Sequence, residues 1–294
     1  MTADDAANEA MNVGGTRHAL GLAEALKVGC FHQVSSVAAA GEYDGRFDES
    51  MFDEAQPLPS AYHRTKFESE RIVREEASVP WRVYRPAIVV GHSETGAMDK
   101  VDGPYYFFPA LKMLRDMLPA WLPLVGIDLG DTNVVPVDYV ATAMDHLAHL
   151  EGHDGEAFHL VNPEPQSVVE MINSFCTAAG APRFATPVDR GTTGSLPFSL
   201  VPGPLRPSRL LTGLVRSGGG RLLLEQAIGR MGIPSEVVGH TSFRPVFDSR
   251  RTEKALAGSA LPSPTSSPTP APCGATGRTT STSPRRTTPR RARR

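Results

Sequence analysis

Apolar and polar positions along the first 180 residues follow two patterns in turn, one typical of helices and one typical of buried strands. Helices are predicted in five segments: 4–28, 61–77, 104–117, 139–150 and 167–180. Short apolar runs between them predict buried strands: 31–40, 82–90, 132–137 and 157–161. Strands that alternate with helices favour a parallel sheet joined by right-handed crossovers. The pattern therefore predicts an α/β fold.

The pattern also predicts the packing, capping, pairing or solvent exposure of several polar or small residues. Gly14–Gly15 lies inside the first helix, where each glycine costs about 1 kcal/mol relative to alanine, which indicates close packing against another backbone or a frayed helix start. Asp138 is expected to cap the helix that follows it. Glu70 and Arg74 are expected to pair on the outer face of the second helix. The acidic residues of the preceding loop, Glu49 among them, are expected to be solvated.

The C-terminal third departs from this pattern. Five prolines between positions 187 and 207 predict irregular structure in residues 182–239, around one amphipathic helix at 222–231. Residues 261–294 are rich in Pro, Ser, Thr and Arg, and from Pro262 onward they contain seven arginines and no acidic residue. Such a composition cannot bury enough apolar surface to fold, so the tail is predicted to be disordered. A nucleic-acid-binding tail and the product of a reading-frame shift are the alternatives.

Composition is that of a soluble globular protein. Of the 294 residues, 40% are hydrophobic and 21% are charged. The net charge is −2, and because the tail is basic, the rest of the chain is acidic and gives no reason to expect a nucleic acid or an anionic membrane as a partner. No apolar run predicts a membrane span, and the N-terminus does not resemble a signal peptide. Three cysteines without metal-ligand spacing predict reduced thiols in a cytoplasmic protein without a metal site.

Three side chains form the candidate site. Tyr62 and Lys66 are four residues apart on a predicted helix, so they lie on one face, one turn from each other. Ser36 lies at the end of an apolar run, where a parallel sheet presents its ligand crevice. A hydroxyl, a phenol and an ammonium that converge there can deliver a proton. The alternative is a core tyrosine beside a lysine whose stem is buried.

Several short motifs extend this observation: Asn12-Val13-Gly14-Gly15-Thr16, Ser35-Ser36 followed by Gly41, Tyr62-x-x-x-Lys66, Arg85-Pro86 and Val135-Pro136-Val137-Asp138-Tyr139-Val140. With these motifs the sequence resembles the extended short-chain dehydrogenase/reductase superfamily. The segment from Gly96 through Asp99 and Asp102 to Phe108 is similar to the male-sterility-type branch of acyl-CoA and thioester reductases, above all to actinobacterial fatty acyl-CoA reductases. The resemblance covers about residues 3–258, and His92 stands where an acid is expected.

The resemblance implies a role for each candidate residue. Tyr62 would donate a proton to a carbonyl oxygen as hydride arrives from a nicotinamide, Ser36 would hydrogen-bond that oxygen, and Asn12 would complete the catalytic set. An ammonium about 4 Å from the phenol at an effective dielectric near 20 contributes on the order of 4 kcal/mol, which lowers the phenol pKa by up to about three units. The cofactor would be held by Ser35, Tyr62, Lys66, Pro86, Ala87, Ile88 and Val89. The implied cofactor is NADP, with NAD left open.

One departure from the family concerns the cofactor's pyrophosphate. The sequence contains no G-x-x-G-x-x-G after a strand, so the resemblance implies a partial Rossmann-like, doubly wound parallel sheet whose N-terminal strands are missing and whose edge is exposed. Residues 1–160 are expected to be the catalytic half of the NAD(P)-binding domain, with 92–130 contributing to the substrate lobe. Residues 161–260 are expected to form a small C-terminal substrate-binding lobe.

Three functions follow as alternatives. The first is an NAD(P)H-dependent oxidoreductase that reduces the carbonyl or thioester of a fatty acyl substrate. The second is an NAD-dependent nucleotide-sugar epimerase or dehydratase of the same superfamily. The third is a non-catalytic fragment that lacks the glycine-rich cofactor loop. A small-molecule acyl substrate is the expected partner, and the oligomeric state is left open.

Overall fold

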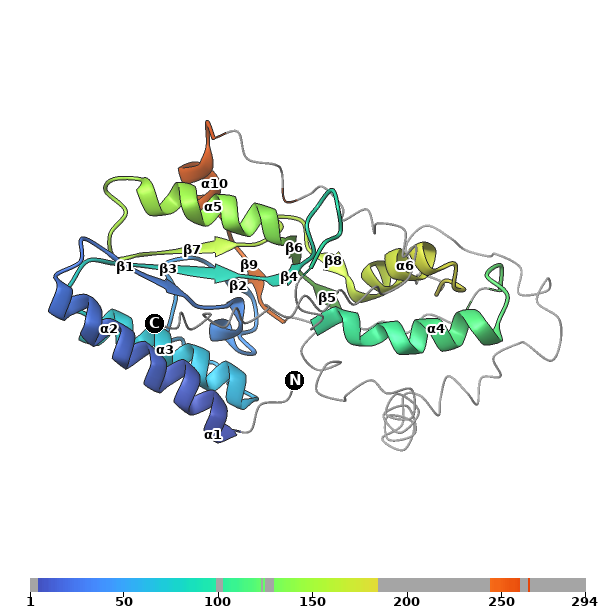
Figure 1. The fold of residues 1–294 in the computed structure, drawn as a ribbon, viewed down its shortest axis with the longest axis horizontal. Helices are drawn as coiled ribbons and strands as arrows, with labels where there is room; N and C mark the ends of the chain where they lie inside the picture. The colour runs from blue at the N-terminus through green and yellow to red at the C-terminus, as the bar shows by residue number, and fades with distance from the viewer. Residues whose placement is uncertain are drawn as a thin grey trace, which may run out of the picture.

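The computed structural model describes residues 5–98, 103–122, 124, 130–184, 244–259 and 264. Figure 1 shows a parallel sheet with helices on both faces and a smaller group of helices beside one end of the sheet. The predicted α/β class and the parallel arrangement are therefore confirmed. The amphipathic helix expected at 222–231 lies outside the described residues, and so does the tail apart from residue 264.

The central sheet contains three parallel strands in the order β1–β3–β7: Phe31–Val34, Trp81–Pro86 and Glu156–Leu160. Val34 pairs with Tyr84, and Tyr84 pairs with Phe158. Among the described strands β1 is an edge, as expected, because it pairs with β3 alone. The strand predicted over 31–40 is shorter than expected, because a 3-10 helix, Val37–Ala40, follows its end.

The strand predicted over 82–90 divides into two. The N–H of Ala87 still bonds to a carbonyl of β7, but the N–H of Ile88 bonds to the carbonyl of Asn133. Residues Ile88–Val90 form β4, which pairs in parallel with β6, Val134–Pro136. The chain therefore leaves the central sheet directly after Pro86 and runs toward the smaller lobe (Figure 1).

One face of the sheet is covered by the helices below it in Figure 1: α1 (Asp5–Asn8), a π-helix (Glu9–Gly14), α2 (Gly15–Leu26) and α3 (Ala61–Glu76). The first three occupy the segment predicted as one helix. The expected close packing at Gly14–Gly15 is wrong, because a Cβ on Gly15 would meet nothing within 4 Å and a Cβ on Gly14 only a carbonyl of its own helix at 4.0 Å. The two glycines instead mark the change from π-helical to α-helical winding.

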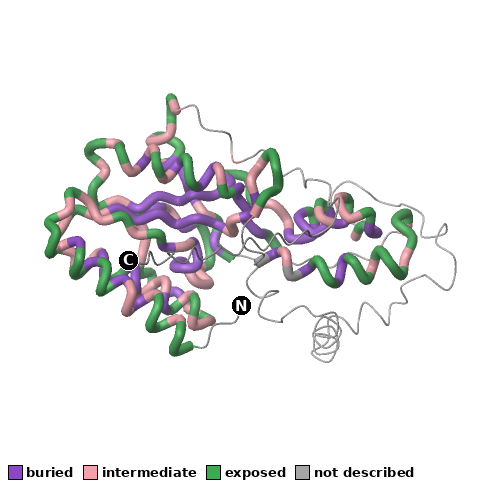
Figure 2. The backbone as a smooth tube through the Cα atoms, viewed as in Figure 1, coloured by how far each residue is buried: buried purple, intermediate pink, exposed green. Residues whose placement is uncertain are grey.

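The opposite face is covered by α5 (Val137–His149) and α10 (Arg250–Leu256). Tyr84, Leu147 and Phe158 belong to the core between these helices and the sheet, and Figure 2 shows the strands as the most buried part of the chain. Asp138 is not the N-cap of α5, because the helix begins at Val137 and its N-cap is Pro136. Its carboxylate instead accepts hydrogen bonds from the backbone N–H and the hydroxyl of Ser93, at 2.8 and 2.7 Å.

Residues 244–259 lie on the main body, although the sequence placed them in the lobe at 161–260. Here β9, Val246–Phe247, pairs in parallel with β2, Arg46–Phe47, and α10 packs on α5 and β7. Residues 244–259 thus belong to the main body and not to the smaller lobe.

The smaller lobe contains a 3-10 helix (Gly103–Phe107), α4 (Phe108–Met117) and α6 (Val168–Ala179). Ser167 and Glu170 form a capping box at the start of α6. A short antiparallel pair, β5 (Asp131–Thr132) with β8 (Gln166–Ser167), joins the lobe to the body. Within the described ranges no helix combines the length and the apolar character that a membrane crossing requires.

Candidate functional site

The N-terminal turns of α3 present Tyr62 and Lys66. Ser60 begins the helix as its N-cap, with its side-chain oxygen accepting from the N–H of His63 at 3.4 Å. The Lys66 ammonium lies 5.9 Å from the centroid of the Tyr62 ring, which agrees with the predicted shared face. Tyr62 is 41% exposed, whereas burial lowers the pKa of Lys66.

Lys66 also joins α3 to the end of β1. Its Nζ donates to the carbonyl oxygen of Val34 at 3.4 Å, two residues before Ser36. Ser36 is the N-cap of the 3-10 helix, and its hydroxyl oxygen accepts from the N–H of Ala38 at 3.2 Å. Because α3 packs against this 3-10 helix, the structure brings the tyrosine, the lysine and the serine to one end of the sheet.

Asn12 contacts the same turn of α3. Its Nδ2 donates to the Thr65 hydroxyl at 2.9 Å, and that hydroxyl donates in turn to the carbonyl of Tyr62 at 3.3 Å. The Asn12 carbonyl accepts from the Thr16 hydroxyl at 2.6 Å. Asn12 thus lies in the π-helix, and it is bound to the helix that carries the candidate tyrosine. π-helical turns are frequent at functional sites.

The predicted cofactor contacts lie at the carboxyl ends of β1 and β3. Pro86 and Ala87 are buried, Ile88 and Val89 are half-buried, and the backbone of this segment is fixed by hydrogen bonds to β7 and to the lobe. Ser35 is buried and its hydroxyl donates to a carboxylate oxygen of Glu70 at 2.9 Å, so its side chain faces the interior.

Glu70 and Arg74 pair as expected, at 2.9 Å, but the predicted outer face is wrong, because Glu70 is fully buried. Glu70 follows Lys66 by one turn, so it shares the face of α3 that meets the sheet. Its second partner is Arg85 of β3, at 2.6 Å from Nη2 to Oε1. Burial alone would raise the pKa of Glu70, but Arg85, together with Arg74 and the Ser35 hydroxyl, outweighs burial and holds that pKa below its usual value. The sequence signal was an arginine inside a buried strand, which requires a counter-ion.

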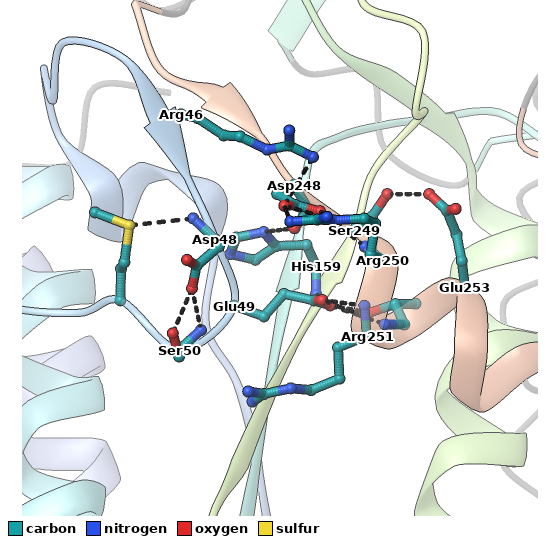
Figure 3. Close-up of polar contacts among 12 residues, drawn as sticks. Arg46, Asp48, Glu49, Ser50, His159, Asp248, Ser249, Arg250, Arg251 and Glu253 are labelled. Atoms are coloured by element: carbon teal, nitrogen blue, oxygen red, sulfur yellow. Dashed lines mark hydrogen bonds and ion pairs between the residues drawn. The ribbon is translucent and has the colours of Figure 1, made fainter.

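Glu49 is a second residue that the sequence placed wrongly in solvent, since it is only 4% exposed. Figure 3 shows its carboxylate directed at the start of α10. There its Oε2 accepts from the backbone N–H of Arg251 at 2.7 Å, and its Oε1 accepts from the N–H and hydroxyl of Thr252 and from the N–H of His159 at 2.9 Å. A carboxylate at a helix N-terminus meets N–H groups that have no partner within the helix.

A parallel sheet with a serine, a tyrosine and a lysine at the carboxyl ends of its strands defines a Rossmann-like domain of the extended short-chain dehydrogenase/reductase class. Residues 3–144 match the sequence profile of the male sterility protein family, and this part of the chain belongs to that family. The relatives include NAD(P)-dependent reductases.

Known proteins with similar sequences are much longer than this chain and match it over a small part of their length. A linear gramicidin synthase chain from Brevibacillus parabrevis is 29% identical over 182 residues, which is 57% of this chain and 3% of that protein. Aldehyde reductase lnbA from Aspergillus flavus is 28% identical over 152 residues, 48% of this chain and 14% of that protein. The chain thus spans a small part of the length of the curated relatives it matches.

Solved structures agree on the fold. The terminal R domain from the myxalamid PKS-NRPS biosynthetic pathway is 28% identical, with a TM-score of 0.56 over 86% of this chain and 58% of that chain. UDP-glucuronic acid 4-epimerase from Bacillus cereus has a TM-score of 0.54 at 15% identity, over 90% of this chain and 66% of that chain. At that identity the second likeness concerns the fold alone.

The residues present fit the nicotinamide half of a dinucleotide. An ammonium has three N–H groups, and the contact to Val34 uses one of them, so Lys66 retains donors for ribose hydroxyls. The segment from Pro86 to Val89 can line the nicotinamide with backbone. The sequence holds no glycine-rich turn for the pyrophosphate, so the fit concerns this half of the cofactor only.

Proposed function

We propose that this chain carries the catalytic part of an NAD(P)H-dependent oxidoreductase that reduces the carbonyl group of a fatty acyl thioester or aldehyde. The observation that carries the proposal is the meeting of Tyr62 and Lys66 on α3 with the strand end that leads into Ser36. The male-sterility-type domain and the 28% identity to a terminal R domain support a reductase rather than an epimerase.

Each side chain has a task in this reaction. A bound reduced nicotinamide supplies the hydride, with NADPH proposed and NADH as the alternative. Tyr62, which is partly exposed, donates the proton to the carbonyl oxygen. Lys66 favours the ionised phenol and holds the nicotinamide ribose. Ser36 orients the carbonyl oxygen by a hydrogen bond. Asn12 and Thr65 hold the turn of α3 on which the tyrosine stands.

The smaller lobe supplies an apolar surface for the substrate. Met113 and Met117 are 38% and 71% exposed on α4, four residues apart and thus on one face of the helix. Methionine side chains adapt their shape to irregular apolar ligands. This exposed face supports an acyl chain as the substrate's non-reacting part.

The test is reduction of acyl-CoA thioesters and of long-chain aldehydes, followed as loss of NADPH or NADH absorbance. Tyr62→Phe is expected to lower kcat by about 100-fold or more, because general acid catalysis contributes on that scale. Unchanged turnover in Tyr62→Phe would refute the assigned role. Turnover of UDP-sugars in place of acyl substrates would favour the epimerase, and failure to bind either cofactor in a fluorescence titration would favour a non-catalytic fragment.

A further inference from the structure

Glu70 forms hydrogen bonds to two other elements of the site from the same face of α3 that carries Tyr62 and Lys66. Its Oε2 accepts from the Ser35 hydroxyl at 2.9 Å and from Arg85 Nε at 3.1 Å. Its Oε1 accepts from Arg85 Nη2 at 2.6 Å. All three side chains are buried, so water does not compete for these bonds.

Ser35 and Arg85, the two partners of Glu70 outside α3, are each the sequence neighbour of a candidate site residue. Ser35 precedes Ser36 at the end of β1, and Arg85 precedes Pro86 at the end of β3. One carboxylate therefore bonds to both strand ends from the helix that carries the proposed proton donor. A displacement of either strand end along α3 would break at least one of these hydrogen bonds.

Arg85 is itself fixed from two further sides. Its Nη2 donates to the carbonyl of Met51 at 2.9 Å, and its Nη1 lies 3.1 Å from Nε2 of His159 on β7. His159 Nδ1 lies 2.8 Å from the carbonyl of Asp248, so Nδ1 carries the proton and Nε2 accepts from Arg85. Burial, followed by the nearby Arg85 charge, lowers the pKa of His159 to about 3, which agrees with this neutral form.

Stability alone does not account for such a pair. A buried ion pair is weak evidence for stability, because well-packed apolar residues often replace it without loss, while a fully hydrogen-bonded one restricts the geometry of its surroundings. Arg85 binds both oxygens of Glu70 side-on, the arrangement with the greatest directional preference.

We propose that Glu70 is a positioning residue of the candidate site: through Ser35 and Arg85 it fixes the distances between Tyr62 and Lys66, the Ser36 hydroxyl and the backbone from Pro86 onward. Glu70 touches neither substrate nor cofactor and acts through these neighbours. The inference rests on the proposed function, which it deepens.

The test compares Glu70→Gln and Ser35→Ala with a matched control, Arg74→Gln. Arg74 also bonds to Glu70 Oε1, at 2.9 Å, but it lies on the same helix and packs on the rings of Phe52 and Trp81, so it does not join α3 to the carboxyl end of a strand. Glu70→Gln is expected to lower kcat on the order of 10- to 100-fold, since a misplacement of 1 Å can cost 100-fold. Ser35→Ala is expected to lower it severalfold, and Arg74→Gln less than twofold.

A double variant separates positioning from folding. Glu70→Met with Arg85→Met replaces the ion pair by apolar side chains, and it is expected to recover thermal stability relative to Glu70→Gln while kcat stays low. Recovery of kcat together with stability would show that Glu70 serves folding only and would overturn the proposal.

A third measurement does not depend on turnover. The chain has five lysines, so their ε-amino groups can be labelled by reductive methylation with carbon-13 and titrated individually, with Lys66→Arg identifying the signal of interest. Burial lowers the pKa of Lys66, and in Glu70→Gln the Lys66 titration is expected to change as the helix shifts. An unchanged Lys66 titration in Glu70→Gln would overturn the proposal.

The outcomes distinguish the two proposals. If Tyr62→Phe keeps its activity, the proposed function fails, whatever Glu70→Gln does. If Tyr62→Phe is inactive while Glu70→Gln keeps its kcat and its Lys66 titration, only the positioning role fails.

Discussion

The hydroxyl of Thr252 donates to a carboxylate oxygen of Glu49, although the two residues lie 203 positions apart in the sequence. The same carboxylate accepts from two backbone N–H groups at the start of α10. Glu49 thereby attaches the segment that follows the lobe to the loop between β1 and α3 (Figure 3).

Glu49→Gln is expected to lower the free energy of unfolding by about 1–3 kcal/mol, because the amide turns a donor toward N–H groups that need an acceptor. Urea unfolding measures the change. Glu54→Gln, in the exposed part of the same loop, is the matched control and is expected to change stability by less than about 0.5 kcal/mol. Equal stability of both variants would contradict the role given to Glu49.

Stability is expected to fall when the pH drops below 6.5, because of His159. The unfolded chain binds a proton on this histidine near 6.5, whereas the folded chain, in which burial lowers its pKa to about 3, does not. The unfolded state therefore binds more protons, and the free energy of unfolding decreases by about 1.4 kcal/mol per pH unit from this residue.

The informative window for His159 lies between pH 6.5 and 4.5. Below pH 4.5, near the usual pKa of a glutamate, carboxylates such as Glu70 also lower the free energy of unfolding. Their pKa values are lower in the folded chain, so the unfolded chain binds the proton first. Urea titrations in this window are expected to give a shallower slope for His159→Gln than for the original chain. His149→Gln, an exposed histidine, is the control and is expected to keep the slope.

Gly41 is expected to tolerate no side chain. It ends the 3-10 helix that Ser36 begins, with φ of +53°, and a Cβ there would lie 2.2 Å from the carbonyl oxygen of Pro57. Gly152 has φ of +79° with nothing within 4 Å, so Gly152→Ala carries the conformational cost alone, about 1–2 kcal/mol. Gly41→Ala is expected to be clearly more destabilising in thermal unfolding; similar melting temperatures would show that the loop at Pro57 yields.

Asn12→Ala and Thr65→Val remove the two ends of one hydrogen bond. If Asn12 acts by holding α3, both variants are expected to lower kcat by a similar factor of about 10, and the double variant by no more than either alone. Steady-state kinetics on all three variants form the cycle. A much larger loss in Asn12→Ala than in Thr65→Val would assign Asn12 a direct part in the chemistry.

Local patterns were enough to predict the element types and the parallel sheet. Tyr62 and Lys66 could be placed together because helical spacing fixes side chains one turn apart, and Ser36 could be placed nearby because parallel strands end at one edge. The burial of Glu70 could not be read in the same way. Its spacing to Arg74 is that of a surface pair, and only the fold shows Arg85 arriving from β3.

The division of the strand over 82–90 illustrates the same limit. Its apolar residues fit one long buried strand, and the change of partner at Ile88 depends on Asn133, which lies more than 40 positions away. Spacing along one sequence contains no information about which distant backbone competes for a hydrogen bond.

The pairing of β2 with β9 has a consequence for synthesis in the cell. Arg46 leaves the ribosome 200 positions before its partner Val246, which at 5–20 residues per second corresponds to a wait of roughly 10–40 s. During that interval Phe47, fully buried in the finished protein, has no cover from the later segment. The nascent chain is therefore expected to depend on chaperones until translation passes Thr252.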